Sequence, residues 1–288
     1  GFLIALLWFV KGSEWVLPIA FSTAAMLLLG WLDDVYTLNV RWRLGWQAMI
    51  AMIIVLWLGP VSAIQWAGHV LAVPWLWSVL AVPALIWMVN LFNFMDGSDG
   101  LATSQSLISA LGFALAFYYN GQSELALIAL CLAAASAGFL FWNRPPARIF
   151  LGDAGSLPLG WCLGLLALVG TLTGSISVCL AFVIVSVFVV DTTATLMLRV
   201  IKRERWYTAH RDHAYQRLIR KNWSHRQVLL VFIALNLMLV MPVVVLVLTF
   251  PGLDFIGALG LGMVLLGLWA WVQFQSVAEN RKNEVDHT

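Results

Sequence analysis

The chain has 288 residues, of which 62% are hydrophobic and 10% are charged, and its mean hydropathy is +0.90. This composition excludes an ordinary soluble domain, in which about half of the residues are apolar and about a quarter are charged. The formal net charge of +2 is too small to indicate nucleic-acid binding, so we expect membrane lipid around the protein and no nucleic-acid partner.

Apolar runs long enough to span a bilayer follow one another along most of the chain. They comprise a fragment at 1–10 and full spans at 15–32, 44–60, 70–92, 101–119, 124–142, 157–172, 176–200, 227–249 and 255–275. We therefore predict an all-α, polytopic membrane bundle with one transmembrane domain over 1–288. The first run has half of the roughly 20 residues that a span needs, so we expect an N-terminal segment to be missing from this sequence.

The basic residues predict which side of the membrane each loop faces. If every span crosses the membrane, all of the 16 Lys and Arg residues except Lys11 fall on one side. The positive-inside rule assigns this side, together with the C-terminus, to the cytoplasm. The loops on the other side are short and nearly uncharged, and we interpret them as plain connectors.

Four polar clusters interrupt the apolar pattern, and the same topology places all of them on the cytoplasmic side. In chain order they are Asp33-Asp34, 90–100, 150–156 and 210–217. Single clusters have simpler explanations, such as a solvated helix end for the aspartate pair or an N-capping turn for 152–156. Their coincidence on one face favours a functional site.

The charged residues of these clusters are typical of a metal-phosphate site. Asp33 and Asp34 are adjacent, and Asp96 and Asp99 lie three residues apart at a predicted helix end, where like charges repel unless a cation binds. Mg²⁺ prefers oxygen ligands, usually one or two carboxylates with waters and substrate phosphates. Glycines in the second and third clusters would permit close approach of a phosphate to the backbone. The Arg and His residues of the fourth cluster would supply positive charge for the same phosphates.

The clusters, in this order, resemble the motifs of the polyprenyl-phosphate N-acetylhexosamine-1-phosphate transferases, a membrane family within glycosyltransferase family 4. The resemblance comprises the aspartate pair, Asn-x-x-Asn-x-x-Asp-Gly-x-Asp-Gly-Leu from Asn90, Phe-Leu-Gly-Asp-Ala-Gly-Ser from Phe150, Asp-Thr at 191–192 and His-Arg-x-His from His210. It implies ten to eleven transmembrane helices in the full-length protein. It also implies a multi-pass protein of the bacterial inner membrane, with its site facing the cytoplasm.

The resemblance further implies an activity and its partners. Members of this family transfer an N-acetylhexosamine 1-phosphate from a UDP-sugar to undecaprenyl phosphate and release UMP. They require Mg²⁺, for which Mn²⁺ is a candidate substitute, and the resemblance is compatible with a homodimer.

Roles for individual residues are also implied by the resemblance. Asp153 would be the main Mg²⁺ ligand, and Asp33 or Asp34 would add to the metal site and place or activate the lipid phosphate. His210, Arg211 and His213 would complete the catalytic set by contacting the diphosphate. The residues expected to bind substrate are Asn90, Asn93, Asp96, Asp99, Gly152 and Ser156.

Several alternatives remain open at this point. A phosphate monoester is already largely ionised near neutral pH, since its second pKa is about 6, which favours direct in-line attack over a covalent phosphoryl-aspartate route. The motif at 210–216 is closer to enzymes that begin O-antigen or related lipopolysaccharide synthesis, so UDP-GlcNAc or a 6-deoxy relative is favoured. A lipid I synthase (phospho-MurNAc-pentapeptide transferase), which has a triple histidine there, is the alternative. A secondary transporter is the rival from another class, because intramembrane acids also mark ion paths.

Overall fold

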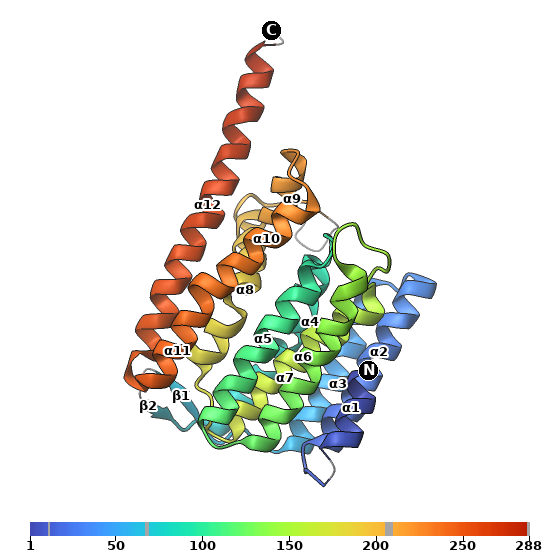
Figure 1. Cartoon of the computed structure of the whole chain (residues 1–288), viewed down its shortest axis with the longest axis vertical. Coiled ribbons are helices and arrows are strands. Elements are labelled where there is room, and N and C mark those ends of the chain that lie inside the picture. Colours follow the sequence, from blue (N-terminus) through green and yellow to red (C-terminus); the bar gives the residue numbers. More distant parts are fainter. Residues whose placement is uncertain (11, 67–68, 205–209, 287–288) are drawn as a thin grey trace.

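The structure, a computed structural model, describes residues 1–10, 12–66, 69–204 and 210–286, with side chains up to Gln275. Its elements are α1 (Phe2–Phe9), α2 (Val16–Tyr36), α3 (Val40–Leu58), β1 (Ile64–Trp66), β2 (His69–Leu71), α4 (Pro74–Met95), α5 (Leu101–Tyr119), α6 (Ser123–Asn143), α7 (Asp153–Leu172), α8 (Val178–Ile201), α9 (Ala214–Arg220), α10 (His225–Leu235), η1 (Asn236–Val240), α11 (Met241–Thr249), η2 (Pro251–Leu253) and α12 (Asp254–Asp286). The predicted all-α bundle is confirmed (Figure 1).

Among the described residues, eight helical segments are long and apolar enough to cross a membrane. They are α2, α4, α5, α6, α7, α8, the segment His225–Thr249 that joins α10 to α11, and Pro251–Gln275 at the start of α12. These segments match eight of the predicted spans. The chain is therefore a multi-pass membrane protein.

The remaining predicted span, 44–60, forms α3 but is not among the eight. Helix α3 begins at Val40 because the Asn39 side chain accepts the Arg41 N–H at 3.0 Å and caps it. Arg41, Arg43 and Gln47 then lie within the first turns of the helix and lower its mean hydropathy. Helix α3 nevertheless packs against α2 and α4 within the bundle.

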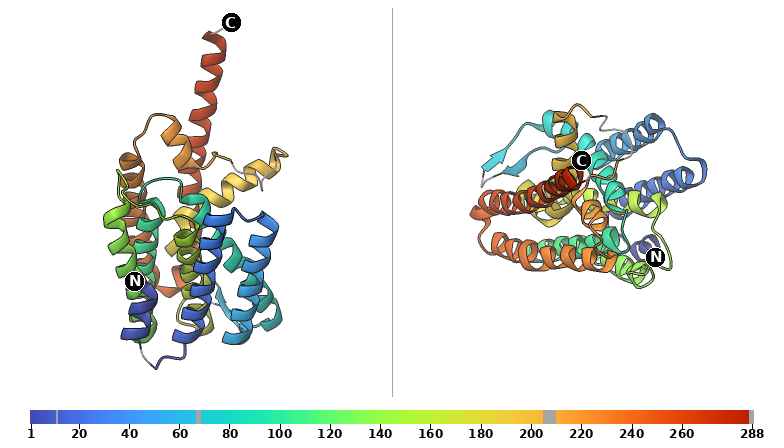
Figure 2. Two further views of the ribbon diagram at one scale, coloured as in Figure 1. Left: turned by 90° about the vertical axis from the view of Figure 1, so that its right-hand side faces the viewer. Right: turned by 90° about the horizontal axis from the view of Figure 1, so that it is seen from above.

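Helix α7 is the element against which the first half of the chain assembles. Both α2 and α4 make extensive contacts with α7, and glycines allow these helices to approach closely. A Cβ at Gly30 would lie 2.1 Å from the Asp153 carbonyl oxygen, and a Cβ at Gly160 would lie 2.3 Å from the Met88 carbonyl oxygen. On the other side of the bundle α5 packs on α6, and α8 packs on α12 (Figure 2).

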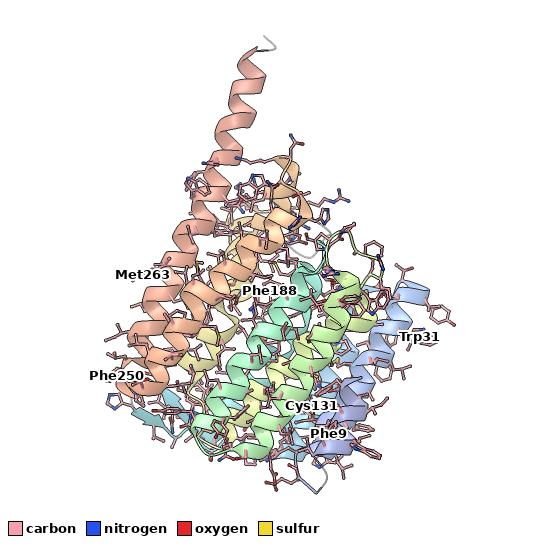
Figure 3. All side chains as sticks on the ribbon, in the orientation of Figure 1. Phe9, Trp31, Cys131, Phe188, Phe250 and Met263 are labelled. Atoms are coloured by element: carbon pink, nitrogen blue, oxygen red, sulfur yellow. The ribbon has the colours of Figure 1, made fainter. Side chains whose placement is uncertain are left out.

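Apolar side chains cover the outside of the bundle as well as its interior (Figure 3). Trp31, Phe250 and Met263 lie on the outer surface, where they are at least half exposed, whereas Phe188 is fully buried between helices. A soluble protein rarely exposes so much apolar surface in contiguous patches. The outer surface is therefore the face expected to contact lipid.

The two ends of the bundle differ in their polar content. The end that carries 33–39, 96–100, 144–152 and 210–224, here called the site end, contains all four polar clusters. At the opposite end the connector between α3 and α4 contains two short antiparallel strands, in which Ile64 pairs with Leu71. Helix α12 continues past the site end to Asp286 (Figure 1). Lys11 and Arg205, which were counted in the charge partition, lie outside the described residues.

Candidate active site

The four polar clusters meet through direct contacts at the site end. Asn93 of the second cluster donates to Asp153 of the third, and Arg43, which follows the first cluster, also contacts Asp153. Tyr215 of the fourth cluster donates to the Phe94 carbonyl at 2.9 Å. The predicted convergence of the clusters is therefore confirmed, although residues in contact lie up to 121 positions apart in the sequence.

Asp153 lies at the centre of these contacts, at the first position of α7. Its Oδ1 accepts a hydrogen bond from the Asn93 Nδ2 at 2.6 Å, and its Oδ2 lies 3.3 Å from the Arg43 Nη1. Asn93 also reaches Ser156, whose Oγ accepts from the Asn93 amide at 3.2 Å. The predicted residues Asn93, Asp153 and Ser156 thus form one connected group.

Asp33 joins this group through Arg43. The Arg43 Nη1 lies 2.8 Å from Asp33 Oδ2, and the backbone N–H of Leu38 donates to Asp33 Oδ1 at 2.7 Å. Asp33 is only 7% exposed, so an unpaired charge there would be costly. Arg43 compensates this charge and ties the end of α2 to the start of α7.

Asp34 has a different environment from its neighbour. Its two carboxylate oxygens accept the backbone N–H groups of Asp153 and Ala154, both at 2.9 Å, so it caps the N-terminus of α7 from another helix. Gly152 leaves room for this contact, because a Cβ there would lie 2.8 Å from Asp34 Oδ2. Gly152 also has φ +63°, a conformation that L side chains rarely adopt. The role of this glycine is therefore explained by helix capping.

Asp96 is the carboxylate that remains open. Among the described residues it accepts no hydrogen bond through its side chain, and burial, followed by the charges of Asp153 and Asp34, raises its pKa to about 8. A pKa raised in this way indicates negative charge that is not compensated locally. A cation bound among these three carboxylates would offset it.

The residues present fit a Mg²⁺ site of the kind found in phosphate-transfer enzymes. The described residues contain no group of three or more His, Cys, Asp and Glu side chains arranged to hold a metal ion. Mg²⁺ needs only one or two carboxylates, however, since waters and substrate phosphates complete its coordination. The oxygens of Asp153 keep acceptor capacity beyond Asn93 and Arg43, and Asp96 is unpaired. Asp33 and Asp34, like Asp153, already accept one hydrogen bond at each carboxylate oxygen, so among the described residues Asp96 is the carboxylate of this group with the most acceptor capacity left.

The fourth cluster closes the site from the side of α8 and α9. His210 and His213 lie with ring centroids 5.0 Å apart, and the His213 ring stacks on Phe94 at 6.1 Å. His213 is 1% exposed and the His210 side chain is 7% exposed. Of the three residues predicted to contact the diphosphate in this segment, Arg211 is the exposed one.

The charge distribution in this segment differs from the prediction. Burial, followed by the charges of His213 and Arg199, lowers the pKa of His210 to about 4, so the positive charge expected on His210 is wrong for the free protein near pH 7. Burial alone would raise the pKa of Asp212, but a hydrogen bond from Arg199 and the charge of Arg217 lower it. Arg211 therefore supplies the accessible positive charge of this segment.

Two of the predicted substrate-binding residues, Asn90 and Asp99, also make hydrogen bonds within the protein. The Asn90 Nδ2 donates to the Gln47 Oε1 at 2.7 Å, which links α4 to α3 within the bundle. The Asp99 Oδ2 accepts the Ala147 N–H at 3.0 Å, and its backbone N–H donates to His225 Nδ1 at 3.2 Å. Neither side chain is joined by a hydrogen bond to Asp153 among the described residues.

Three residues at the site carried no role in the sequence-based prediction. Arg43 entered the prediction only as one of the basic residues of the charge partition, Tyr215 only as a member of the cluster 210–217, and His225 lies outside the four clusters. Arg43 lies ten residues after Asp33, across the turn between α2 and α3, and nothing in that spacing indicates a bridge. Tyr215 could have been suspected, since it lies two residues after the end of the His-Arg-x-His motif.

Comparison with known proteins gives one matching family profile and three similar proteins that bear on this site. The sequence profile described as glycosyl transferase family 4 matches residues 16–171, more than half of the chain. The probable undecaprenyl-phosphate N-acetylglucosaminyl 1-phosphate transferase of Bacillus subtilis (strain 168) is 29% identical over 211 residues, which is 72% of this chain and 59% of the relative.

Two phospho-N-acetylmuramoyl-pentapeptide-transferases are also similar. The protein of Gloeothece citriformis is 30% identical over 252 residues, which covers 78% of this chain and 66% of the relative. The protein of Moorella thermoacetica is 36% identical over 137 residues, which covers 46% of this chain and 43% of the relative. The chain thus spans less than two thirds of the length of each of these relatives.

Proposed function

The chain belongs to glycosyl transferase family 4, and on this premise we propose that it transfers a sugar 1-phosphate from a nucleoside-diphosphate sugar to a polyprenyl phosphate. The observation that carries the proposal is the position of Asp153, which Asn93 and Arg43 hold at the start of α7 beside the unpaired Asp96. This arrangement suits a reaction between two anionic phosphates, because it combines a site for a divalent cation with the exposed Arg211, in a segment that contacts Phe94 through His213 and Tyr215.

The preferred substrates are UDP-GlcNAc, or a 6-deoxy relative, and undecaprenyl phosphate. The Bacillus subtilis relative is named for undecaprenyl phosphate and N-acetylglucosaminyl 1-phosphate, and the motif at 210–216 also favours this subgroup. The alternative is lipid I synthesis, since other relatives are phospho-N-acetylmuramoyl-pentapeptide-transferases. The proposed place of the reaction is the cytoplasmic face of the bacterial inner membrane, at the start of surface polysaccharide synthesis.

In the proposed reaction, an oxygen of the lipid phosphate attacks the sugar-bearing β-phosphorus of the donor. A new P–O bond forms, the bond between the two donor phosphates breaks, and UMP leaves with the electron pair. Mg²⁺, held by Asp153 with Asp96 nearby, would offset the charge of the reacting phosphates. Arg211 would attract the diphosphate, and Arg43 would keep Asp33 and Asp153 in place.

Direct attack is supported over a phosphoryl-aspartate intermediate by the hydrogen bonds of the aspartate pair. Asp33 accepts from Leu38 and Arg43, and Asp34 caps α7 with both oxygens. A nucleophilic carboxylate would first have to break these contacts. A lipid phosphate needs no such activation, because it is already largely ionised near neutral pH.

The proposal is tested by UMP release from purified protein given undecaprenyl phosphate and a panel of UDP-sugars, with Mg²⁺ or with a chelator. We expect Mg²⁺-dependent release with one sugar preferred, and loss of turnover by more than about 100-fold in Asp153→Asn without loss of the folded state. Asp254→Asn is the matched control, because Asp254 begins α12 at the opposite end. No release with any sugar, together with solute flux in proteoliposomes, would instead support a transporter.

A further inference from the structure

Asp191 makes a buried contact between α8 and the start of α9 that the reaction above does not use. Its Oδ1 accepts the backbone N–H of Ala214 at 2.9 Å and lies 3.6 Å from His213 Nδ1. Thr195, one turn further along α8, donates its Oγ1 to the same oxygen at 3.2 Å. Asp191 is 5% exposed, and a carboxylate buried in a transmembrane helix has a cost that favours a functional explanation.

His213 extends this contact across the site to the second cluster. Its ring stacks on Phe94 and also on Tyr215, where the ring centroids are 6.1 Å apart and the planes differ by 14°. The Tyr215 hydroxyl then donates to the Phe94 carbonyl, and a Cβ at Gly97 would lie 2.2 Å from that hydroxyl. A continuous chain of contacts therefore runs from Asp191 to the turn at 94–97, which carries Asp96.

Helix capping alone does not explain a carboxylate at position 191. An amide or hydroxyl oxygen could accept the Ala214 N–H equally well. The negative charge has a specific neighbour in the His213 imidazole, and both Asp191 Oδ2 and His213 Nδ1 are buried without a hydrogen-bond partner among the described residues. Catalytic hydrogen bonds are often long in ligand-free proteins and shorten in the substrate complex.

We propose that Asp191 and His213 are positioning residues, which dock the segment 210–214 onto the turn at 94–97 and thereby set where Arg211 and Asp96 lie relative to Asp153. On this reading the buried His213 does not contact the diphosphate but acts through Arg211 and Asp96. The proposal deepens the proposed function and rests on it.

The kinetic test uses Asp191→Asn, His213→Gln and the double variant. Asp191→Asn keeps an acceptor for the Ala214 N–H and removes only the charge, so the variant should fold. We expect each single change to lower kcat for UMP release by about 10- to 100-fold with KM for the UDP-sugar within about threefold of wild type. The kcat of the double variant should be no lower than that of the poorer single variant, because Asp191 and His213 act through the same contact.

Thr195→Val is the matched control, because it removes another partner of the Asp191 carboxylate but leaves the Ala214 and His213 contacts in place. It should leave kcat within about twofold. Wild-type kcat in Asp191→Asn, or effects that multiply in the double variant, would overturn the proposal. A rise in KM at unchanged kcat in His213→Gln would also overturn it, because it would indicate direct substrate contact.

A second measurement does not depend on catalysis. Hydrogen–deuterium exchange of the ligand-free protein should become faster in Asp191→Asn both at 213–218 and at the turn 94–97. If exchange became faster at 213–218 alone, Asp191 would act only as a cap for α9. The proposed docking of 210–214 onto the turn at 94–97 would then be overturned. If the wild-type protein releases no UMP, the proposed function fails, whereas the docking of the two segments is still decided by this exchange measurement.

Discussion

Asp34 Oδ1 accepts the backbone N–H of Asp153 at 2.9 Å, so the carboxylate at the end of α2 caps the helix that begins with the proposed metal ligand. Its second oxygen accepts from Ala154. Unpaired N–H groups and the helix dipole both stabilise a carboxylate at this position. Asp34 therefore fixes where Asp153 lies, and the adjacent aspartates of the first cluster have separate structural tasks.

Asp34→Asn should weaken this cap. The amide can replace one oxygen as acceptor, but its NH₂ group would face a backbone N–H, and the favourable charge is lost. We expect a loss of about 1–2 kcal/mol in the free energy of unfolding and a fall in kcat of about tenfold. Thermal melting in detergent and UMP release measure the two effects. Glu124→Gln, in the first turn of α6, is the control and should change neither. Unaltered melting of Asp34→Asn would contradict the capping role.

Arg43 should be required both for stability and for the metal response. Arg43→Gln leaves Asp33 buried without its cation, which should cost about 2–4 kcal/mol of unfolding free energy, and it frees Asp153 from the guanidinium. The apparent Mg²⁺ requirement should therefore change as well. Melting curves and Mg²⁺ titrations of UMP release test this, with Arg41→Gln as the exposed control in the same helical turn. Equal melting temperatures and equal Mg²⁺ titrations for Arg43→Gln and Arg41→Gln would show that the contacts of Arg43 with Asp33 and Asp153 are dispensable.

Gly30→Ala should separate α2 from α7. The added Cβ would lie 2.1 Å from the Asp153 carbonyl oxygen, which is backbone and cannot rotate away. Overpacking of this kind costs about 1–3 kcal/mol, and it displaces Asp34 from the helix that it caps, so activity should fall by more than about tenfold. Gly45→Ala is the matched control, since a Cβ there meets nothing within 4 Å. Wild-type melting and turnover in Gly30→Ala would disprove the close packing.

The fold could be predicted from the sequence because the bilayer imposes a simple rule. A backbone without water must form helices, and about 20 apolar residues are needed for each span. The predicted ends of the spans were less accurate at the site end of the bundle. Helix α2 continues through Asp33 and Asp34 to Tyr36, and α7 already begins at Asp153, whereas the predicted spans stopped at 32 and started at 157. Charged residues ended the hydropathy pattern before the helices ended, because contacts at the site end stabilise those charges.

The residues of the candidate site were predicted only in part, because their contacts depend on how the helices pack. A motif identifies residues of the right chemistry but does not show which way a helix presents them. Asn90 and Asn93 belong to one motif, yet they are three residues apart on α4, and Asn90 contacts Gln47 whereas Asn93 contacts Asp153. Arg43 was missed because its bridge depends on the turn between α2 and α3. Such a contact follows from packing and has no local sequence pattern.

Asp96 should make stability depend on pH when Mg²⁺ is absent. Its folded-state pKa is raised to about 8, first by burial and then by the charges of Asp153 and Asp34, whereas the unfolded value is near 3.8. The folded state binds the proton more tightly, so stability should be constant below about pH 4 and should fall as pH rises toward 8, by at most about 1.4 kcal/mol per unit. Melting temperatures from pH 5 to 8.5 should therefore fall more steeply in wild type than in Asp96→Asn. Parallel plots of melting temperature against pH for wild type and Asp96→Asn would contradict the raised pKa of Asp96.

Asp96 and Asp99 should respond differently to the same substitution, although the sequence predicted donor binding for both. Asp99→Asn keeps an acceptor for the Ala147 N–H, so kcat/KM for the UDP-sugar should fall by less than about tenfold, with a small loss of stability. Asp96→Asn removes the open carboxylate beside Asp153, and kcat/KM should fall by about 100-fold with little loss of stability. Steady-state kinetics and melting temperatures of Asp96→Asn and Asp99→Asn, measured at the same Mg²⁺ concentration, test this difference. If Asp99→Asn were the more damaging change for kcat/KM, the open carboxylate would have been assigned to the wrong residue of the motif.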